Sequence, residues 1–128
     1  VQRRFTKRIP AISYLSYKDR LTALGLELEL EYRRLKFDLV MTFKIINNLV
    51  DIDRDSLVTV NNCNTRNAYL KLYKPRCLTT LRSRFLCIRS VKVWNSLSDS
   101  VRGASSVLAF KHYLKSCELC KFLTVFKF

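Results

Sequence analysis

The chain has 128 residues, and its 24 lysines and arginines against 10 aspartates and glutamates give a formal net charge of +14 at pH 7. The length predicts one domain, and 48% hydrophobic residues argue against intrinsic disorder. No apolar run approaches the roughly 20 residues of a membrane-spanning helix. Such a positive charge destabilises a compact chain unless a polyanion relieves it, so nucleic acid is the first partner to consider. A merely solvated basic surface and an anionic membrane surface are the alternatives.

The cysteines are odd in number, and no signal peptide precedes them: Cys63, Cys77, Cys87, Cys117 and Cys120. Neither secretion nor a disulfide framework is indicated, so we expect free, mostly buried thiols in an intracellular protein. The chain starts without methionine in a segment, VQRRFTKRI, that is typical of a helix already under way. We therefore expect a piece of a longer protein.

The first residues predict a basic amphipathic helix that ends before Pro10, because the residue preceding a proline disfavours helical geometry. A spacing of four would place its apolar residues on one face: Val1, Phe5 and Ile9. The rest of its surface would carry Arg3, Arg4, Lys7 and Arg8. A second short helix is predicted after Ser16, which can cap it together with Asp19, and should end near Gly25.

The strongest periodic segment predicts a long amphipathic helix over residues 29–49. Its apolar residues recur at steps of three and four: Leu28, Tyr32, Leu35, Leu39, Phe43, Ile46 and Val50. After it, Asp51, Asp53 and Asp55 alternate as at the start of a calcium loop. Ser56 and Asn62 stand where that loop needs glycine and glutamate, so we interpret the segment as a solvated turn.

Residues 61–67 are turn-like in composition, and residues 69–74 alternate apolar with basic side chains as an edge strand does. Residues 79–85 could pair back to complete a short β-hairpin, or form a helix instead. The predicted fold class is therefore mainly α, a small helical domain with one long amphipathic helix and a short β-hairpin.

The C-terminal third predicts two more helices. Val91, Trp94 and Leu97 suit a short helix in which Trp94 anchors the core and does not stack on a base. Ser105 or Ser106 can cap a second helix, whose apolar face would comprise Val107, Phe110, Leu114 and Cys117. The apolar and basic tail would be exposed unless it packs back.

No constellation of catalytic or metal-binding residues is visible. Cys117 and Cys120 form a C-x-x-C near His112, but a structural zinc site needs four ligands and the chain has no second pair. The single histidine has no identifiable carboxylate partner, and two glycines cannot build a phosphate-cradling loop. We expect no enzyme activity, no metal and no cofactor.

The best candidate for a binding site is the segment between Asp55 and Asp99, which contains no acidic residue. Its cations are the predicted nucleic-acid-binding residues: Arg66, Lys71, Lys74, Arg76, Arg82, Arg84, Arg89 and Lys92. They would contact phosphates, and an exposed Tyr69 or Tyr73 could stack on an unpaired base. The competing interpretation is a positively charged edge that docks on an acidic neighbouring domain.

Three blocks follow one another with short connections: residues 1–53, residues 65–97 and residues 105–115. They contain QRR followed by IP, then YKDRL, YRR, KIINNLVD, LKLYKPR and WNSL. This succession resembles the region after the polymerase domain of non-LTR (LINE-type, jockey and CR1-like) retrotransposon reverse transcriptases. The sequence departs from that pattern at Asn67 and Ala68, where Gly-His is common, and at Ser98, where proline is common.

The resemblance implies that residues 1–116 are a C-terminal helical segment that follows the thumb of an RNA-directed DNA polymerase, with residues 117–128 as an apolar, basic tail. The catalytic Y/F-x-D-D signature of the family is absent from this sequence. The implied role is help in holding template RNA or target DNA, inside a nuclear or cytoplasmic ribonucleoprotein. The implied partners are RNA or DNA and the upstream polymerase domain, with no membrane, and the alternative role is a structural module packing on that domain.

Overall fold

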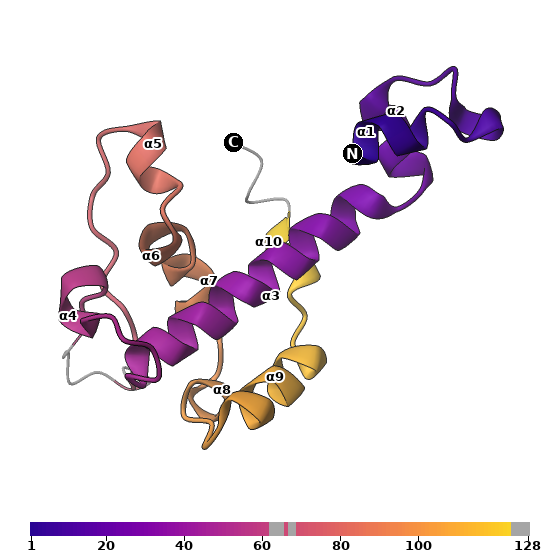
Figure 1. The fold of residues 1–128 in the computed structure, drawn as a ribbon. Helices are drawn as coiled ribbons and strands as arrows, with labels where there is room; N and C mark the ends of the chain where they lie inside the picture. Colours follow the sequence, from indigo (N-terminus) through magenta and orange to yellow (C-terminus); the bar gives the residue numbers. More distant parts are fainter. Residues whose placement is uncertain (62–65, 67–68, 124–128) are drawn as a thin grey trace.

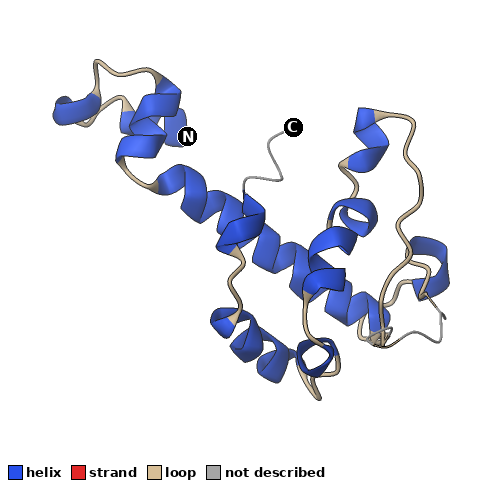
Figure 2. Cartoon of the chain, turned by 180° about the vertical axis from the view of Figure 1, so that it is seen from behind, coloured by secondary structure: helices blue, strands red, loops and turns tan. Residues whose placement is uncertain are grey.

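The computed structural model describes residues 1–61, 66 and 69–123, except for the side chains of residues 27–30 and 120. Over these residues the chain is mainly helical, as predicted (Figures 1 and 2). The elements are α1 (Gln2–Thr6), the 3-10 helix η1 (Pro10–Ile12), α2 (Tyr17–Ala23), α3 (Leu26–Ile46), α4 (Arg54–Leu57), α5 (Thr80–Ser83), α6 (Leu86–Arg89), α7 (Val91–Ser96), α8 (Asp99–Arg102), α9 (Val107–Ser116) and α10 (Cys120–Leu123).

Helix α3 is the long helix that the periodicity predicts, and it forms the axis of the molecule. Figure 1 shows α1, η1 and α2 at its N-terminal end, α10 beside its middle and the other helices towards its C-terminal end. The helix ends at Ile46 because Asn48 adopts a left-handed conformation, with φ of 53°. The Asn48 and Leu49 N–H groups then bond to the Ile45 and Lys44 carbonyls at 3.1 and 2.8 Å. This Schellman arrangement stops α3 three residues before the predicted end.

The hydrophobic core forms where α3 meets α7 and α9. The rings of Phe43 and Phe110 stack with centroids 4.4 Å apart, and Trp94 lies 5.8 Å from Phe110. Trp94 is 0% exposed, which confirms its predicted role as a core anchor. Leu35 and Leu39 of α3 are buried in the same cluster. The core thus joins residues that lie more than 60 positions apart in the sequence.

The predicted helix caps at Ser16 and Ser106 are confirmed. The Ser16 hydroxyl accepts a hydrogen bond from the Asp19 N–H at 3.2 Å, and Ser106 accepts one from the Ala109 N–H at 3.1 Å. Each satisfies a backbone donor that the first helical turn leaves unpaired. Asp53 caps α4, so the acidic turn begins a short helix.

The predicted β-hairpin is wrong for the described residues, where the only β pairing is a single antiparallel bridge between Val60 and Leu72. Leu72 finds no second strand because the side-chain amide of Asn95 takes its place. The Leu72 N–H donates to Asn95 Oδ1 at 2.8 Å, and Asn95 Nδ2 donates to the Leu72 carbonyl at 2.8 Å. Residues 79–85 instead contain the short helix α5, which Thr79 caps. Most of the turn predicted at 61–67 lies outside the described residues.

Two further side chains fix the backbone next to Leu72. The indole N–H of Trp94 donates to the Leu70 carbonyl at 2.8 Å, and Arg102 Nε donates to the Tyr69 carbonyl at 2.9 Å. Because a buried polar backbone group needs a partner, this clamp substitutes for a β-ladder. We call Trp94, Asn95 and Arg102 the backbone clamp.

The apolar face predicted for the first helix is wrong. Phe5 is 65% exposed, whereas Thr6 is fully buried. Thr6 turns inward because its hydroxyl accepts a hydrogen bond from Arg20 Nε of α2 at 3.2 Å. A polar contact with α2, which periodicity does not reveal, therefore sets the orientation of α1.

The tail packs back onto the core through Leu123. Leu119 and Leu123 are buried in the same cluster as the α3 and α9 residues, and α10 lies against α3. Leu119 and Leu123 of the expected tail therefore belong to the same hydrophobic core as the helical segment. Residues 124–128 lie outside the described part.

Replacement of Asn95 by alanine should destabilise the fold by about 3 kcal/mol, because the Leu72 N–H and carbonyl would both lose their partner. Urea unfolding followed by circular dichroism measures this change. Lys92→Ala, at an exposed position on the same helix, should shift the unfolding free energy by no more than about 0.5 kcal/mol. Equal effects of the two substitutions would contradict the clamp.

Candidate nucleic-acid interface

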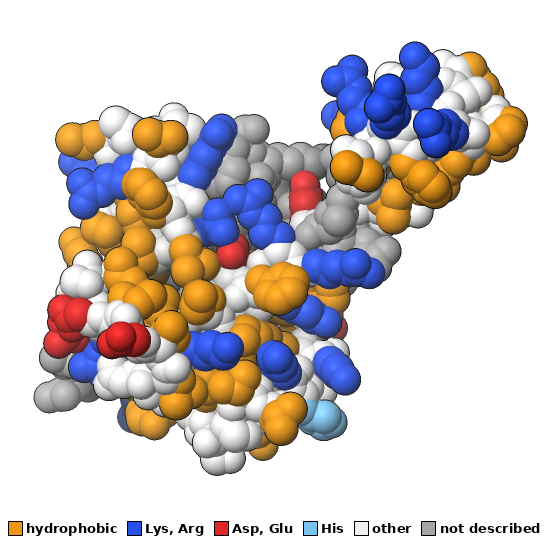
Figure 3. Space-filling view, in the orientation of Figure 1, with side chains coloured by type: hydrophobic (Ala, Val, Ile, Leu, Met, Phe, Trp, Pro, Cys, Tyr) orange, Lys and Arg blue, Asp and Glu red, His pale blue; other side chains and the backbone are white. Residues whose placement is uncertain are grey.

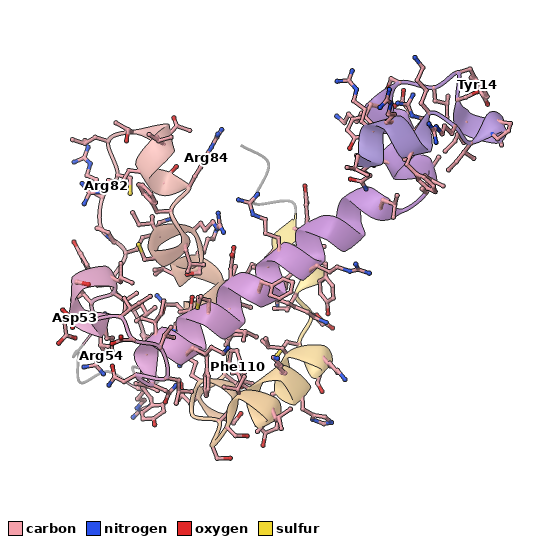
Figure 4. All side chains as sticks on the ribbon, viewed as in Figure 1. Tyr14, Asp53, Arg54, Arg82, Arg84 and Phe110 are labelled. Carbon is pink, nitrogen blue, oxygen red and sulfur yellow. The ribbon has the colours of Figure 1, made fainter. Side chains whose placement is uncertain are left out.

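The predicted binding residues lie before and after Leu72 in the loop that leads to α5, at α5 and its C-terminal end, and on the short helices α6 and α7. Six are exposed, namely Arg66, Lys74, Arg76, Arg82, Arg84 and Lys92. Lys71 and Arg89 are half-buried. Figure 4 shows Arg82 and Arg84 on different sides of α5. Most of the predicted cations thus face solvent.

Residues 73–85, which we call the basic arm, leave the backbone clamp and run to α5 and Phe85. In Figures 1 and 2 this segment stands away from α3 on the side of the molecule that also carries α4. Lys74, Arg76 and Arg82 point into solvent there, and no carboxylate of the described residues pairs with them. The arm therefore presents uncompensated positive charge at a position fixed by the clamp.

Arg89 has a different role from the exposed cations. Its Nε and Nη2 atoms donate to the two carboxylate oxygens of Asp38 on α3, both at 2.7 Å, and its Nη1 donates to the Arg84 carbonyl at 3.0 Å. The bidentate pair joins α6 to α3 with both side chains mostly buried. Because these donors are already engaged, we leave Arg89 out of the proposed contact surface.

The two tyrosines suggested as stacking residues are both exposed, but their surroundings differ. Tyr69 lies against Gly103, where an added Cβ would come within 3.1 Å of the ring. One side of that ring is therefore occupied by the α8–α9 turn. Both tyrosines are 58% exposed, so we prefer Tyr73 for base stacking only because Gly103 lies against the Tyr69 ring.

The basic arm also exposes large apolar side chains. Leu78 is 89% exposed and Leu81 is 75% exposed. Phe85, four positions after Leu81, is exposed as well. Figure 3 shows hydrophobic and basic side chains next to one another on this side of the molecule. Single exposed apolar residues are ordinary, whereas a group of them marks an interaction site.

Composition did not reveal two structural arginines. Arg102 is buried and donates to the carbonyls of Tyr69, Asn95 and Leu97, and it pairs with Asp99. Arg20 is buried and bonds to Thr6. For Arg102, the acid three residues earlier on the same helix was the available signal. For Arg20 the sequence holds no comparable signal.

The described residues contain no group of histidine, cysteine and acidic side chains able to hold a metal ion. Cys77, Cys87 and Cys117 are free and half-buried, so these three are less buried than expected. Burial raises the pKa of the Cys117 thiol above its ordinary value, although the positive charge of Lys121 acts in the opposite direction. A thiol with a raised pKa is a weak nucleophile at neutral pH.

Comparison with protein-family models, with curated proteins and with solved structures found no match to this chain. None of the helices in the described part of the chain is long and apolar enough to cross a membrane.

Removal of either partner of the Arg89–Asp38 pair should destabilise the fold by about 3 kcal/mol, since the remaining charge would be buried without a partner. Arg89→Met and Asp38→Asn, measured singly and together by urea unfolding, form a double-mutant cycle. The double variant should lose less than the sum of the single losses. Additive losses would show that the pair does not join α6 to α3. The control is Lys111→Met at an exposed position, which should change the unfolding free energy little.

Proposed function

We propose that this chain is a non-catalytic C-terminal part of a retrotransposon-encoded reverse transcriptase that helps to hold template RNA or target DNA. The observation that carries the proposal is the exposure of the cations in the acid-free segment, above all Lys74, Arg76 and Arg82. The order of the QRR, YKDRL, KIINNLVD, LKLYKPR and WNSL motifs supports the parentage.

Contact with phosphates accounts for this arrangement in physical terms. Lysine and arginine side chains that neutralise phosphates release condensed counterions, and this release provides sequence-independent affinity. Exposed side chains on the basic arm can adjust to the irregular phosphate backbone of a single strand. The backbone clamp meanwhile fixes the start of the arm. The exposed ring of Tyr73 adds a surface on which an unpaired base can stack.

Simultaneous replacement of Lys74, Arg76 and Arg82 by glutamine should reduce the salt dependence of single-strand binding. With about 0.7 released counterions per contact, three lost contacts lower the slope of log K against log salt by about 2. Fluorescence anisotropy with a labelled single strand at several salt concentrations measures the slope.

The matched control for this variant is the replacement of Lys111, Lys115 and Lys121 by glutamine, which removes the same charge from exposed positions on α9 and α10. This control should retain most of the slope. Equal losses in the two triple variants would mean that net charge alone attracts the strand. A flat salt dependence in the unchanged protein would remove the phosphate-contact mechanism altogether.

A second candidate function is a structural module that packs against the polymerase domain of the parent protein. The exposed Leu78, Leu81 and Phe85 favour it, because these side chains bury little in the isolated chain. An apolar and acidic surface on the partner would match their interleaving with Arg76 and Arg82.

The variant Leu78→Ser with Leu81→Ser separates the two functions. It should weaken association with a separately expressed polymerase domain by at least tenfold, about 1.4 kcal/mol, while leaving oligonucleotide affinity unchanged. Isothermal titration calorimetry with the polymerase domain measures the first quantity. Unchanged association would remove the docking function. The glutamine variant of Lys74, Arg76 and Arg82 is measured in both assays for comparison.

A further inference from the structure

Residues 1–24 form a small unit of α1, η1 and α2 that projects from the N-terminal end of α3 (Figure 1). The unit contains six lysines and arginines and one carboxylate. Figure 3 shows the basic side chains gathered on its visible face. We call it the N-terminal unit, and none of the predicted nucleic-acid-binding residues lies in it.

A buried arginine organises this unit. Arg20 of α2 donates through Nε to the Thr6 hydroxyl at 3.2 Å and through Nη1 to the Leu15 carbonyl at 2.5 Å. Its guanidinium carbon and that of Arg3 lie 5.8 and 5.7 Å from the centroid of the Tyr17 ring. These contacts hold α1 against α2 without an apolar core of their own.

The remaining cations of the unit all face solvent: Arg3, Arg4, Lys7, Arg8 and Lys18. The single carboxylate, Asp19, accepts a hydrogen bond from the Ser16 hydroxyl at 2.6 Å and makes no ion pair among the described residues. Arg4 lies on α1, and Lys7 and Arg8 lie in the turn that directly follows it. The unit therefore concentrates positive charge that a bound polyanion would neutralise.

Exposed aromatic rings accompany these charges. Tyr14, between η1 and α2, is 80% exposed, and Figure 4 shows it at the outer end of the unit. Phe5 is also exposed. Cations next to accessible aromatic rings are typical of proteins that bind single-stranded nucleic acid, where phosphates meet the charges and bases stack on the rings.

Helix α3 sets the separation between this unit and the basic arm. The arm is tied to α3 through Arg89 and Asp38, and Asp38 lies 12 residues after Leu26 at the start of the helix. At 1.5 Å per residue, this stretch is about 18 Å long. This stretch lies within one uninterrupted helix.

We infer that the N-terminal unit is a second contact site for single-stranded nucleic acid, with Arg4, Lys7 and Arg8 on phosphates and Tyr14 stacked on a base. The unit and the basic arm hold one strand at two points, and α3 sets the distance between them. The bridging rests on the proposed function of the arm, whereas binding by the N-terminal unit does not.

Single strands of different length distinguish binding at one site from binding at both sites. A single strand of about 4 nucleotides, which at about 3.4 Å per nucleotide is too short to bridge the two sites, should occupy each site independently, so the full chain binds two copies of it. A strand of about 30 nucleotides should bind once and at least tenfold more tightly, because the second contact becomes intramolecular. Analytical ultracentrifugation gives the stoichiometry, and fluorescence anisotropy gives the affinity.

Replacement of Arg4, Lys7 and Arg8 by glutamine should remove one of the two short strands and abolish the gain from the longer strand. Tyr14→Ala should weaken single-strand binding about tenfold and leave binding of a fully paired duplex unchanged, because only an unpaired base can stack. The control is again the glutamine variant of Lys111, Lys115 and Lys121. Circular dichroism confirms that each variant is folded.

The outcomes distinguish the two proposals. If the N-terminal variant behaves like the control while the arm variant loses binding, the second site is overturned and the arm stands. If the arm variant behaves like the control while the N-terminal variant loses binding, the proposed arm function fails, and so does the bridging. Binding of the unit to vesicles of phosphatidylserine but not to oligonucleotides would overturn the nucleic-acid assignment.

Discussion

The fold depends on how the backbone of residues 69–72 is held. This segment has the alternation of an edge strand, but side chains from α7 and α8 satisfy most of its polar backbone groups. Arg102 bonds to Tyr69, Trp94 to Leu70 and Asn95 to Leu72, while the Lys71 carbonyl accepts from the Asn61 N–H. Since buried backbone groups without partners destabilise a fold, this clamp is what allows a loop to cross the helical core.

The clamp also connects the core with the candidate interface. Trp94 packs beside Phe110, which stacks on Phe43 of α3, while the indole N–H of Trp94 holds Leu70. The basic arm begins directly after this anchored segment. Its charged side chains therefore extend from a rigid base, and Arg89 fastens its far end to α3 through Asp38. The position of the arm is thus set both by the packing of Trp94 in the core and by the Arg89–Asp38 ion pair.

Arginine has two distinct roles in this chain, and the distinction matters for any assignment from charge. Arg20, Arg89 and Arg102 donate to backbone carbonyls, a hydroxyl or a carboxylate inside the molecule. Arg4, Arg76 and Arg82 are exposed. The planar guanidinium group with its five donors suits both tasks. The net charge of +14 therefore overstates the charge available to a partner.

The sequence alone determined several of the local elements. The three-and-four spacing from Leu28 to Val50 identified α3, hydroxyl side chains identified a cap at Ser16 and another at Ser105 or Ser106, and Trp94 identified the core. These features depend on contacts within a turn or two of the same segment, or on strong hydrophobicity, so they can be read without a fold. The exposure expected for Lys74, Arg76 and Arg82 follows in the same way from their surroundings in the sequence.

The tertiary structure alone decided the rest. Whether residues 69–74 would pair with residues 79–85 depended on Asn95, which lies 23 positions after Leu72 and bonds to the Leu72 backbone groups. Whether Arg89 would face solvent depended on Asp38, which lies 51 positions earlier, and the inward turn of Thr6 depended on Arg20. Hydrogen bonds and ion pairs between distant residues have no period along the chain, so only the folded arrangement reveals which of several possible partners is taken.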